Sequence, residues 1–80
     1  MVQSKIEIYT TPSCAYCHMA KEYFKSKGLE YEEIDVLKNV PKRQEMITET
    51  GQMGVPVIKI NRQIVIGFNK SKINELLGLG

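Results

Sequence analysis

Four short segments of the chain alternate or concentrate apolar residues in the manner of β-strands. The segments are Ser4–Thr10, Tyr31–Val36, Val55–Ile60 and Gln63–Ile66. In the first, Ile6 and Ile8 share one face, and in the second Ile34 and Val36 form the face that suits a core. Only two residues separate the last two segments, so we expect an antiparallel hairpin there.

A helical spacing of apolar residues appears between these strands. It predicts a helix over Ala15–Lys27, a second from Asn39 to Gly51, and a third from Asn69 to the terminal glycines Gly78 and Gly80. Asparagine at the start and glycine at the end are typical helix boundaries. The expected buried positions are Cys17, Ala20, Phe24, Val40, Met46, Ile47, Thr50, Ile73, Leu76 and Leu77, whereas Lys21, Glu22 and Lys25 are expected to face solvent.

The predicted order is β-α-β-α-β-β-α, an α/β arrangement whose first two strands run parallel through a right-handed crossover. Residues 1–80 are expected to form a single domain with one small core, acting as a monomer. The formal charge is +2 with both signs interspersed, which gives no indication of nucleic-acid binding. No segment approaches the roughly 18 consecutive apolar residues of a transmembrane helix, so no membrane association is expected.

Both cysteines of the chain lie in the stretch from Thr11 to His18, where the first strand gives way to the first helix. A sulfur at a helix N-terminus is favoured as a thiolate by unpaired N–H groups and by the helix dipole. Cys14 is therefore the expected nucleophile. Cys17 lies about one helical turn further on, within reach of Cys14, so the pair can close a disulfide. A reducing cytoplasm is the expected compartment for such a pair.

The motif Thr11-Pro12-Ser13-Cys14-Ala15-Tyr16-Cys17, with Val55-Pro56-Val57-Ile58 before the hairpin and Gly67 before the last helix, resembles the glutaredoxins over nearly the whole chain. The resemblance implies the thioredoxin-like fold, with a four-stranded mixed sheet in the order 2-1-3-4 flanked by three helices. It also implies a thiol–disulfide oxidoreductase that reduces protein or small-molecule disulfides through a Cys14/Cys17 dithiol, and a cis Val55–Pro56 bond beside the cysteines. The substrate contacts it suggests are Tyr16, Val55, Pro56, Gly67 and Phe68.

The chain departs from glutathione-using members of that family at three places. Ala15 follows the first cysteine where proline is usual, and Thr11 stands where a basic residue is common. Phe68-Asn69-Lys70 follows Gly67 in place of a second glycine and an acidic residue. Glutathione remains an alternative co-substrate, as in a deglutathionylase, but a thioredoxin-reductase-type enzyme is the expected electron donor. No other cofactor is expected, and the resemblance leaves open whether position 14 is natively selenocysteine.

A different class of function is suggested by Cys14-Ala15-Tyr16-Cys17-His18, which matches the c-type haem attachment pattern. A non-catalytic carrier of haem or a metal cluster is therefore the alternative. Haem attachment usually requires a mostly helical surround, which the strand pattern does not favour. A structural zinc site needs four ligands, and the chain has only two cysteines and one histidine, so no metal site is expected.

Overall fold

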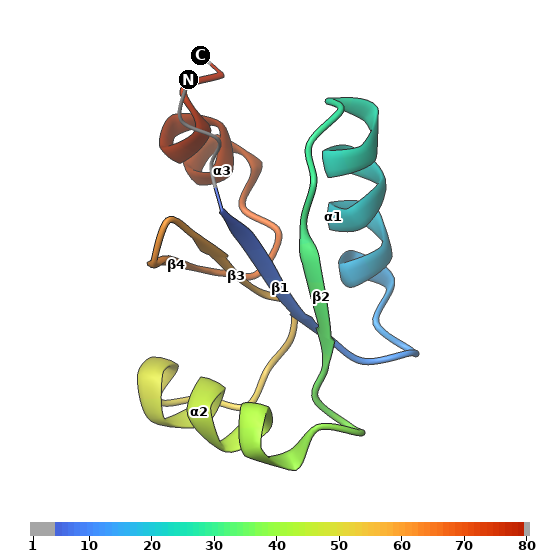
Figure 1. Cartoon of the computed structure of the whole chain (residues 1–80), viewed down its shortest axis with the longest axis vertical. Helices are drawn as coiled ribbons and strands as arrows, with labels where there is room; N and C mark the ends of the chain where they lie inside the picture. Colours follow the sequence, from blue (N-terminus) through green and yellow to red (C-terminus); the bar gives the residue numbers. More distant parts are fainter. Residues whose placement is uncertain (1–4, 80) are drawn as a thin grey trace.

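A computed structural model of the protein describes residues 5–79. The four strands and three helices follow the predicted order along the chain (Figure 1). They are β1 (Ile6–Thr10), α1 (Ala15–Ser26), β2 (Glu32–Asp35), α2 (Val40–Thr50), β3 (Val57–Ile60), β4 (Gln63–Ile66) and α3 (Lys70–Leu77).

The strands form one mixed sheet in the order β2-β1-β3-β4, as expected. β1 runs parallel to β2 and antiparallel to β3, while β3 and β4 form the antiparallel hairpin. Asn61 and Arg62 connect the hairpin with φ values of 51° and 74°. Two successive positive φ angles are the conformation of a type I′ turn, whose twist matches the flanking strands. The sequence left the type of this turn open.

Apolar side chains on the two faces of the sheet build two separate core clusters. The first contains Ile6 and Ile8 and is covered by Ala20 and Phe24 of α1 and by Ile73 of α3. The second lies on the opposite face, where Met46 of α2 packs among buried residues Tyr9, Ile34, Val36 and Val57. Helices α1 and α3 thus cover one face and α2 the other. Within residues 5–79, no helix has the length and apolar character needed to cross a bilayer.

Local sequence signals set the ends of the helices. The side chains of Asn39 and Asn69 accept hydrogen bonds from backbone amides at the starts of α2 and α3. Gly51 and Gly78 end the same two helices in the left-handed conformation, with φ near 72° and 71°. These positions confirm the predicted caps.

Several predicted details are wrong or lie outside the described residues. The third strand begins at Val57 rather than Val55, because Pro56 has no N–H to offer a neighbouring strand. The second strand spans only residues 32–35, and the first helix ends at Ser26. Val40, an expected core residue, is 49% exposed, since it stands in the first turn of α2 at the edge of the packed face. Residues 1–4 and 80 are outside the described range.

Candidate dithiol active site

One terminus of each of the four strands lies at the same end of the sheet. The register pairs Tyr9 near the end of β1 with Val57 at the start of β3, and Val57 with Ile66 at the end of β4. The parallel strand β2 ends beside Thr10, whose carbonyl accepts a hydrogen bond from the Val36 amide at 2.9 Å. The loops at these strand ends carry Cys14, the Val55–Pro56 pair and Gly67, and Cys17 lies in the first turn of α1. The fold therefore gathers most of the sequence-predicted site residues at one end of the sheet.

Cys14 is the N-cap residue of α1, with φ −87° and ψ 108°. Its Sγ accepts a hydrogen bond from the Cys17 amide at 3.1 Å, in the manner in which serine or aspartate caps a helix. The Cys14 amide donates in turn to the Thr11 carbonyl at 3.3 Å, which fixes the approach of the chain to the helix. Cys14 is only half-buried, so its sulfur is accessible from solvent. Its position at the helix N-terminus also favours a negative charge on the sulfur.

Cys17 has a different environment, although it lies one turn away on the same helix. It is 1% exposed, and its Sγ lies 4.0 Å from the Tyr9 carbonyl oxygen, to which the thiol donates. Burial raises the pKa of the Cys17 thiol to about 12, and the hydrogen bond with Cys14 adds to that rise. A hydrogen bond with the Thr11 backbone and the positive charge of Lys21 act in the opposite direction. Cys17 is thus held as a neutral thiol beneath Cys14.

Lys21 does not face solvent as the helical pattern predicted. Its side chain is only 17% exposed, and its Nζ lies 2.9 Å from Glu33 Oε2 on β2. The Thr10 hydroxyl donates to the same carboxylate oxygen at 2.9 Å. The hydrogen bond with Glu33 raises the pKa of Lys21, and the same bond lowers the pKa of Glu33. The prediction failed because the lysine stem can lie along the protein surface and deliver the ammonium group to a neighbouring strand.

Val55 and Pro56 precede β3, and the bond between them is cis, which confirms the expectation drawn from the family resemblance. Pro56 is buried and its carbonyl accepts a hydrogen bond from the Gly67 amide at 2.8 Å. Gly67 has a φ of +80°, and a Cβ added there would meet no other atom within 4 Å. The backbone conformation alone therefore explains the glycine, and the space above it is open.

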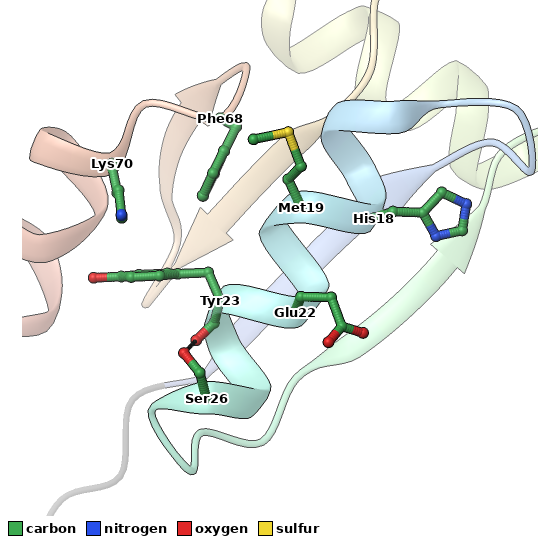
Figure 2. A pocket seen from close by; sticks show the side chains of 7 residues that line it. All are labelled: His18, Met19, Glu22, Tyr23, Ser26, Phe68 and Lys70. Carbon is green, nitrogen blue, oxygen red and sulfur yellow. Dashed lines mark hydrogen bonds between the residues drawn. The ribbon is translucent and has the colours of Figure 1, made fainter.

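Phe68 and the outer face of α1 enclose a shallow groove of about 560 Å³ beside this end of the sheet (Figure 2). Its lining residues are His18, Met19, Glu22, Tyr23, Ser26, Phe68 and Lys70. Phe68 is half-buried, packs against the first core cluster and makes an edge contact with Tyr23 at 5.9 Å between ring centroids. In Figure 2, Met19 points toward Phe68 and His18 points away from it. Tyr16 stands on the first turn of α1 with 62% of its surface exposed.

Sequence reasoning missed two contributors to this region, the Lys21–Glu33 pair and Met19. The signal for Lys21 was its spacing from Cys17, because residues i and i+4 lie on the same face of a helix. Met19 is 51% exposed and carried no sequence signal beyond its position on the first helix. Among residues 5–79, no three histidine, cysteine, aspartate or glutamate side chains come together in a way that could hold a metal ion.

Comparisons with known proteins agree with this architecture. The glutaredoxin family model matches residues 6–65. An uncharacterized glutaredoxin-like 8.6 kDa protein in the rubredoxin operon of Clostridium pasteurianum is 43% identical over 72 residues, which cover 90% of this chain and 96% of that protein. Glutaredoxin 3 of Escherichia coli is 42% identical over 64 residues, covering 80% of this chain and 77% of the relative.

Two solved structures have the same fold and similar sequences. The thioredoxin-like protein BC3987 superimposes with a TM-score of 0.84 at 36% identity, over 91% of this chain and 100% of the other. The glutaredoxin-like protein NrdH-redoxin of Escherichia coli gives a TM-score of 0.75 at 32% identity, over 90% of this chain and 93% of that structure. The work on that protein describes a thioredoxin-like activity profile.

Proposed function

The chain belongs to the glutaredoxin family, and we propose that it reduces disulfides of protein substrates through a dithiol formed by Cys14 and Cys17. Membership and fold indicate a thiol–disulfide oxidoreductase in general terms. The observation that supports the specific proposal is the contrast between two sulfurs one turn apart. One caps the helix and is reachable, while the other is buried and neutral.

In the proposed reaction, the Cys14 thiolate attacks one sulfur of a substrate disulfide and the other substrate sulfur leaves as a thiolate. Cys17 then attacks Cys14 Sγ, breaks the mixed disulfide and releases the second substrate thiol. The protein ends with a Cys14–Cys17 disulfide, so two electrons have passed to the substrate. The hydrogen bond from the Cys17 amide to Cys14 Sγ supports the order of these steps, because it favours the thiolate at position 14.

The substrate contacts that we propose surround Cys14. The backbone of Val55, next to buried Pro56, is available to an extended substrate segment as a one-residue β-augmentation. The open space above Gly67 lets a second backbone approach. Exposed Tyr16 and half-buried Phe68 offer further apolar contacts. We further propose that the protein acts as a monomer in a reducing compartment such as the cytoplasm, where the dithiol is maintained.

We propose a flavin-dependent enzyme of the thioredoxin-reductase type as the electron donor. Glutathione carries an ammonium group that would need an acidic partner beyond Gly67, and the first turn of α3 contains no acidic residue. That turn carries Lys70, whose charge repels an ammonium group. The similarity to NrdH-redoxin, with its thioredoxin-like activity profile, supports the same donor. Glutathione is the alternative, in keeping with the similarity to glutaredoxin 3.

The test is a coupled assay that follows NADPH consumption with a disulfide-bearing protein as substrate. One series contains thioredoxin reductase, and the other contains glutathione with its own reductase. We expect turnover with the first system and at least about tenfold slower turnover with the second, since losing two charge partners costs about 1.4 kcal/mol or more. Cys14→Ser should abolish turnover in both series. Efficient turnover with glutathione alone would overturn the donor assignment, and turnover by Cys14→Ser would overturn the dithiol mechanism.

A further inference from the structure

The resolving cysteine presents a chemical difficulty that the proposed function leaves open. Only a thiolate attacks a disulfide, yet Cys17 is 1% exposed and burial raises its pKa to about 12. Some group must favour the charged form of Cys17 during the second step. The helix dipole acts mainly on the cap residue Cys14, so the group has to be found among the side chains around the buried thiol.

Lys21 is the positively charged side chain that acts on Cys17. It follows Cys17 by four residues, so both side chains lie on the same face of α1. The ammonium group is held on that face by Glu33 Oε2 at 2.9 Å, and the Thr10 hydroxyl donates to the same oxygen. Because only 17% of the Lys21 side chain is exposed, water screens its charge less than that of a fully exposed lysine.

We propose that Lys21, held by Glu33 and Thr10, is the cation that favours the thiolate of Cys17 during the resolving attack. This proposal rests on the dithiol function given above. Lys21 acts through its charge, while Glu33 and Thr10 are positioning residues. The ammonium group does not take the proton, because the hydrogen bond with Glu33 already favours its charged form.

The neighbours of Cys17 change their influence once the mixed disulfide has formed. Cys14 then has no proton and no charge, so its opposition to a second negative charge disappears. The remaining titratable or charged groups in this cluster are His18 and Lys21 on α1, Tyr31 before β2, and Glu33 on β2. Of these, Lys21 has the sign that stabilises a thiolate at Cys17 and a direct influence on it.

The step balances without any added reagent. Cys17 loses its proton to solvent, and its sulfur forms a bond to Cys14 Sγ. The bond between Cys14 Sγ and the substrate sulfur breaks, and the electron pair leaves on the substrate sulfur, which takes up a proton from solvent. In this step Cys17 is oxidised and the substrate sulfur is reduced, while Cys14 exchanges one disulfide bond for another.

The size of the effect follows from two opposing trends. A nearby opposite charge lowers the pKa of an acid by about one to three units, and Lys21 has the smallest of the influences on Cys17, so we take about one unit. Removing Lys21 then leaves about tenfold less thiolate at neutral pH. The more basic thiolate is a better nucleophile, by about threefold for one unit. The resolving step should therefore slow by about threefold at neutral pH. The same factor is expected throughout the neutral to mildly alkaline range, because Cys17 stays mostly protonated well below its pKa of about 12.

The experiment uses a dipyridyl disulfide, an uncharged reagent that releases a coloured product at each step, in stopped-flow mixing with the reduced protein. The first phase reports attack by Cys14, and the second reports attack by Cys17. For Lys21→Met we expect an unchanged first phase, and a second phase about threefold slower than in the wild type between about pH 7 and pH 9. Lys21→Arg, which keeps the charge, should restore the wild-type rate.

The matched control is Lys25→Met, which removes the same charge from the same helix one turn further on, where the side chain is 63% exposed. It should leave both phases unchanged. A second phase of Lys21→Met that equals the wild type, that Lys21→Arg fails to restore, or that is slowed equally in Lys25→Met would overturn the proposal. Absence of two phases in the wild type would instead overturn the dithiol function itself.

Discussion

Two half-buried lysines lie on opposite faces of the sheet and are built in similar ways. Lys21 of α1 has 17% of its side chain exposed and pairs with Glu33, while Lys59 of β3 has 12% exposed and pairs with Glu49 at 2.5 Å. Both connect a helix to a strand. On the α2 face, however, the Lys59 Nζ lies 5.6 Å from the centre of the Tyr9 ring, so its neighbour is a packed aromatic side chain and not a thiol.

The difference lies in what each cation faces. Lys59 joins α2 to the sheet through Glu45 and Glu49, so its expected role is to hold the second core cluster together. Lys21 favours the charged form of a buried thiol, which has to ionise in the proposed mechanism. A partly buried ion pair is therefore no sign of function by itself, and the neighbouring group decides whether its charge has a chemical use.

The largest expected effect is the trapping of a substrate, which should depend on the cysteines of the α1 side and not on Lys59 of the α2 side. Cys17→Ser should accumulate a mixed disulfide between Cys14 and a substrate protein, because the attack that releases it is lost. Cys14→Ser should accumulate none. Lys59→Met, on the other face, should behave as the wild type in this respect. Mass spectrometry of the non-reduced protein after incubation with a disulfide-bearing protein measures the adduct.

This comparison fails if the two cysteine variants trap substrate equally, because that result would remove the ordered roles of Cys14 and Cys17. It also fails if Lys59→Met accumulates the adduct while remaining folded. The fold of each variant is checked by circular dichroism before the trapping is compared.

Most of the fold could be predicted because each helix and strand is indicated by residues that are close together in the sequence. The alternation around Ile6 and Ile8, the spacing of Ala20 and Phe24, and asparagine caps agree with one another at every element. The cap position of Cys14 followed from the same logic. These features depend on residues within one turn or one strand of each other.

The pairing of Lys21 with Glu33 depends instead on where two distant elements lie. A lysine on a helix is ordinarily assigned to solvent, and the assignment changes only when the register of β1 and β2 is known. That register pairs Ile8 with Glu33 and sets the carboxylate at the height of the second turn of α1. Local periodicity carries no information about such a contact, although the i to i+4 spacing from Cys17 indicated the correct face.

A smaller effect concerns stability at high pH, and it tests the burial of Cys17 directly. The folded-state pKa of Cys17 is raised from 9.0 to about 12, so the protonated thiol stabilises the reduced protein fully below about pH 9. That contribution is lost progressively as pH rises from 9.0 toward 12, since the unfolded chain ionises first. By about pH 10 the loss should reach about 1.4 kcal/mol, from one unit of difference in ionisation.

Urea unfolding of reduced wild type and Cys17→Ala, at neutral pH and at about pH 10, isolates this contribution from lysine and tyrosine ionisation common to both proteins. The stability advantage of the wild type should shrink by about 1.4 kcal/mol between the two conditions. Lys59→Met, compared with the wild type in the same way, measures how far the free energy of unfolding changes with pH because of the α2 face. A constant difference between wild type and Cys17→Ala would show that the thiol is not shielded in solution.

The smallest expected effect concerns the groove between α1 and Phe68. Met19 is 51% exposed and points toward Phe68, so a partner protein could cover it without any change in the core (Figure 2). Covering such a side chain contributes about 0.8 kcal/mol for each buried methylene. Met19→Ala should therefore raise KM for a disulfide-bearing protein by about threefold to tenfold, while kcat and the reduction of a small dipyridyl disulfide stay unchanged. Leu79→Ala is the matched control, because Leu79 is 42% exposed, follows α3 and is not among the residues that line the groove. An equal rise in KM for both variants would remove the groove from the substrate surface, and a loss of small-disulfide reduction in Met19→Ala would mean that Met19 supports Cys14 itself.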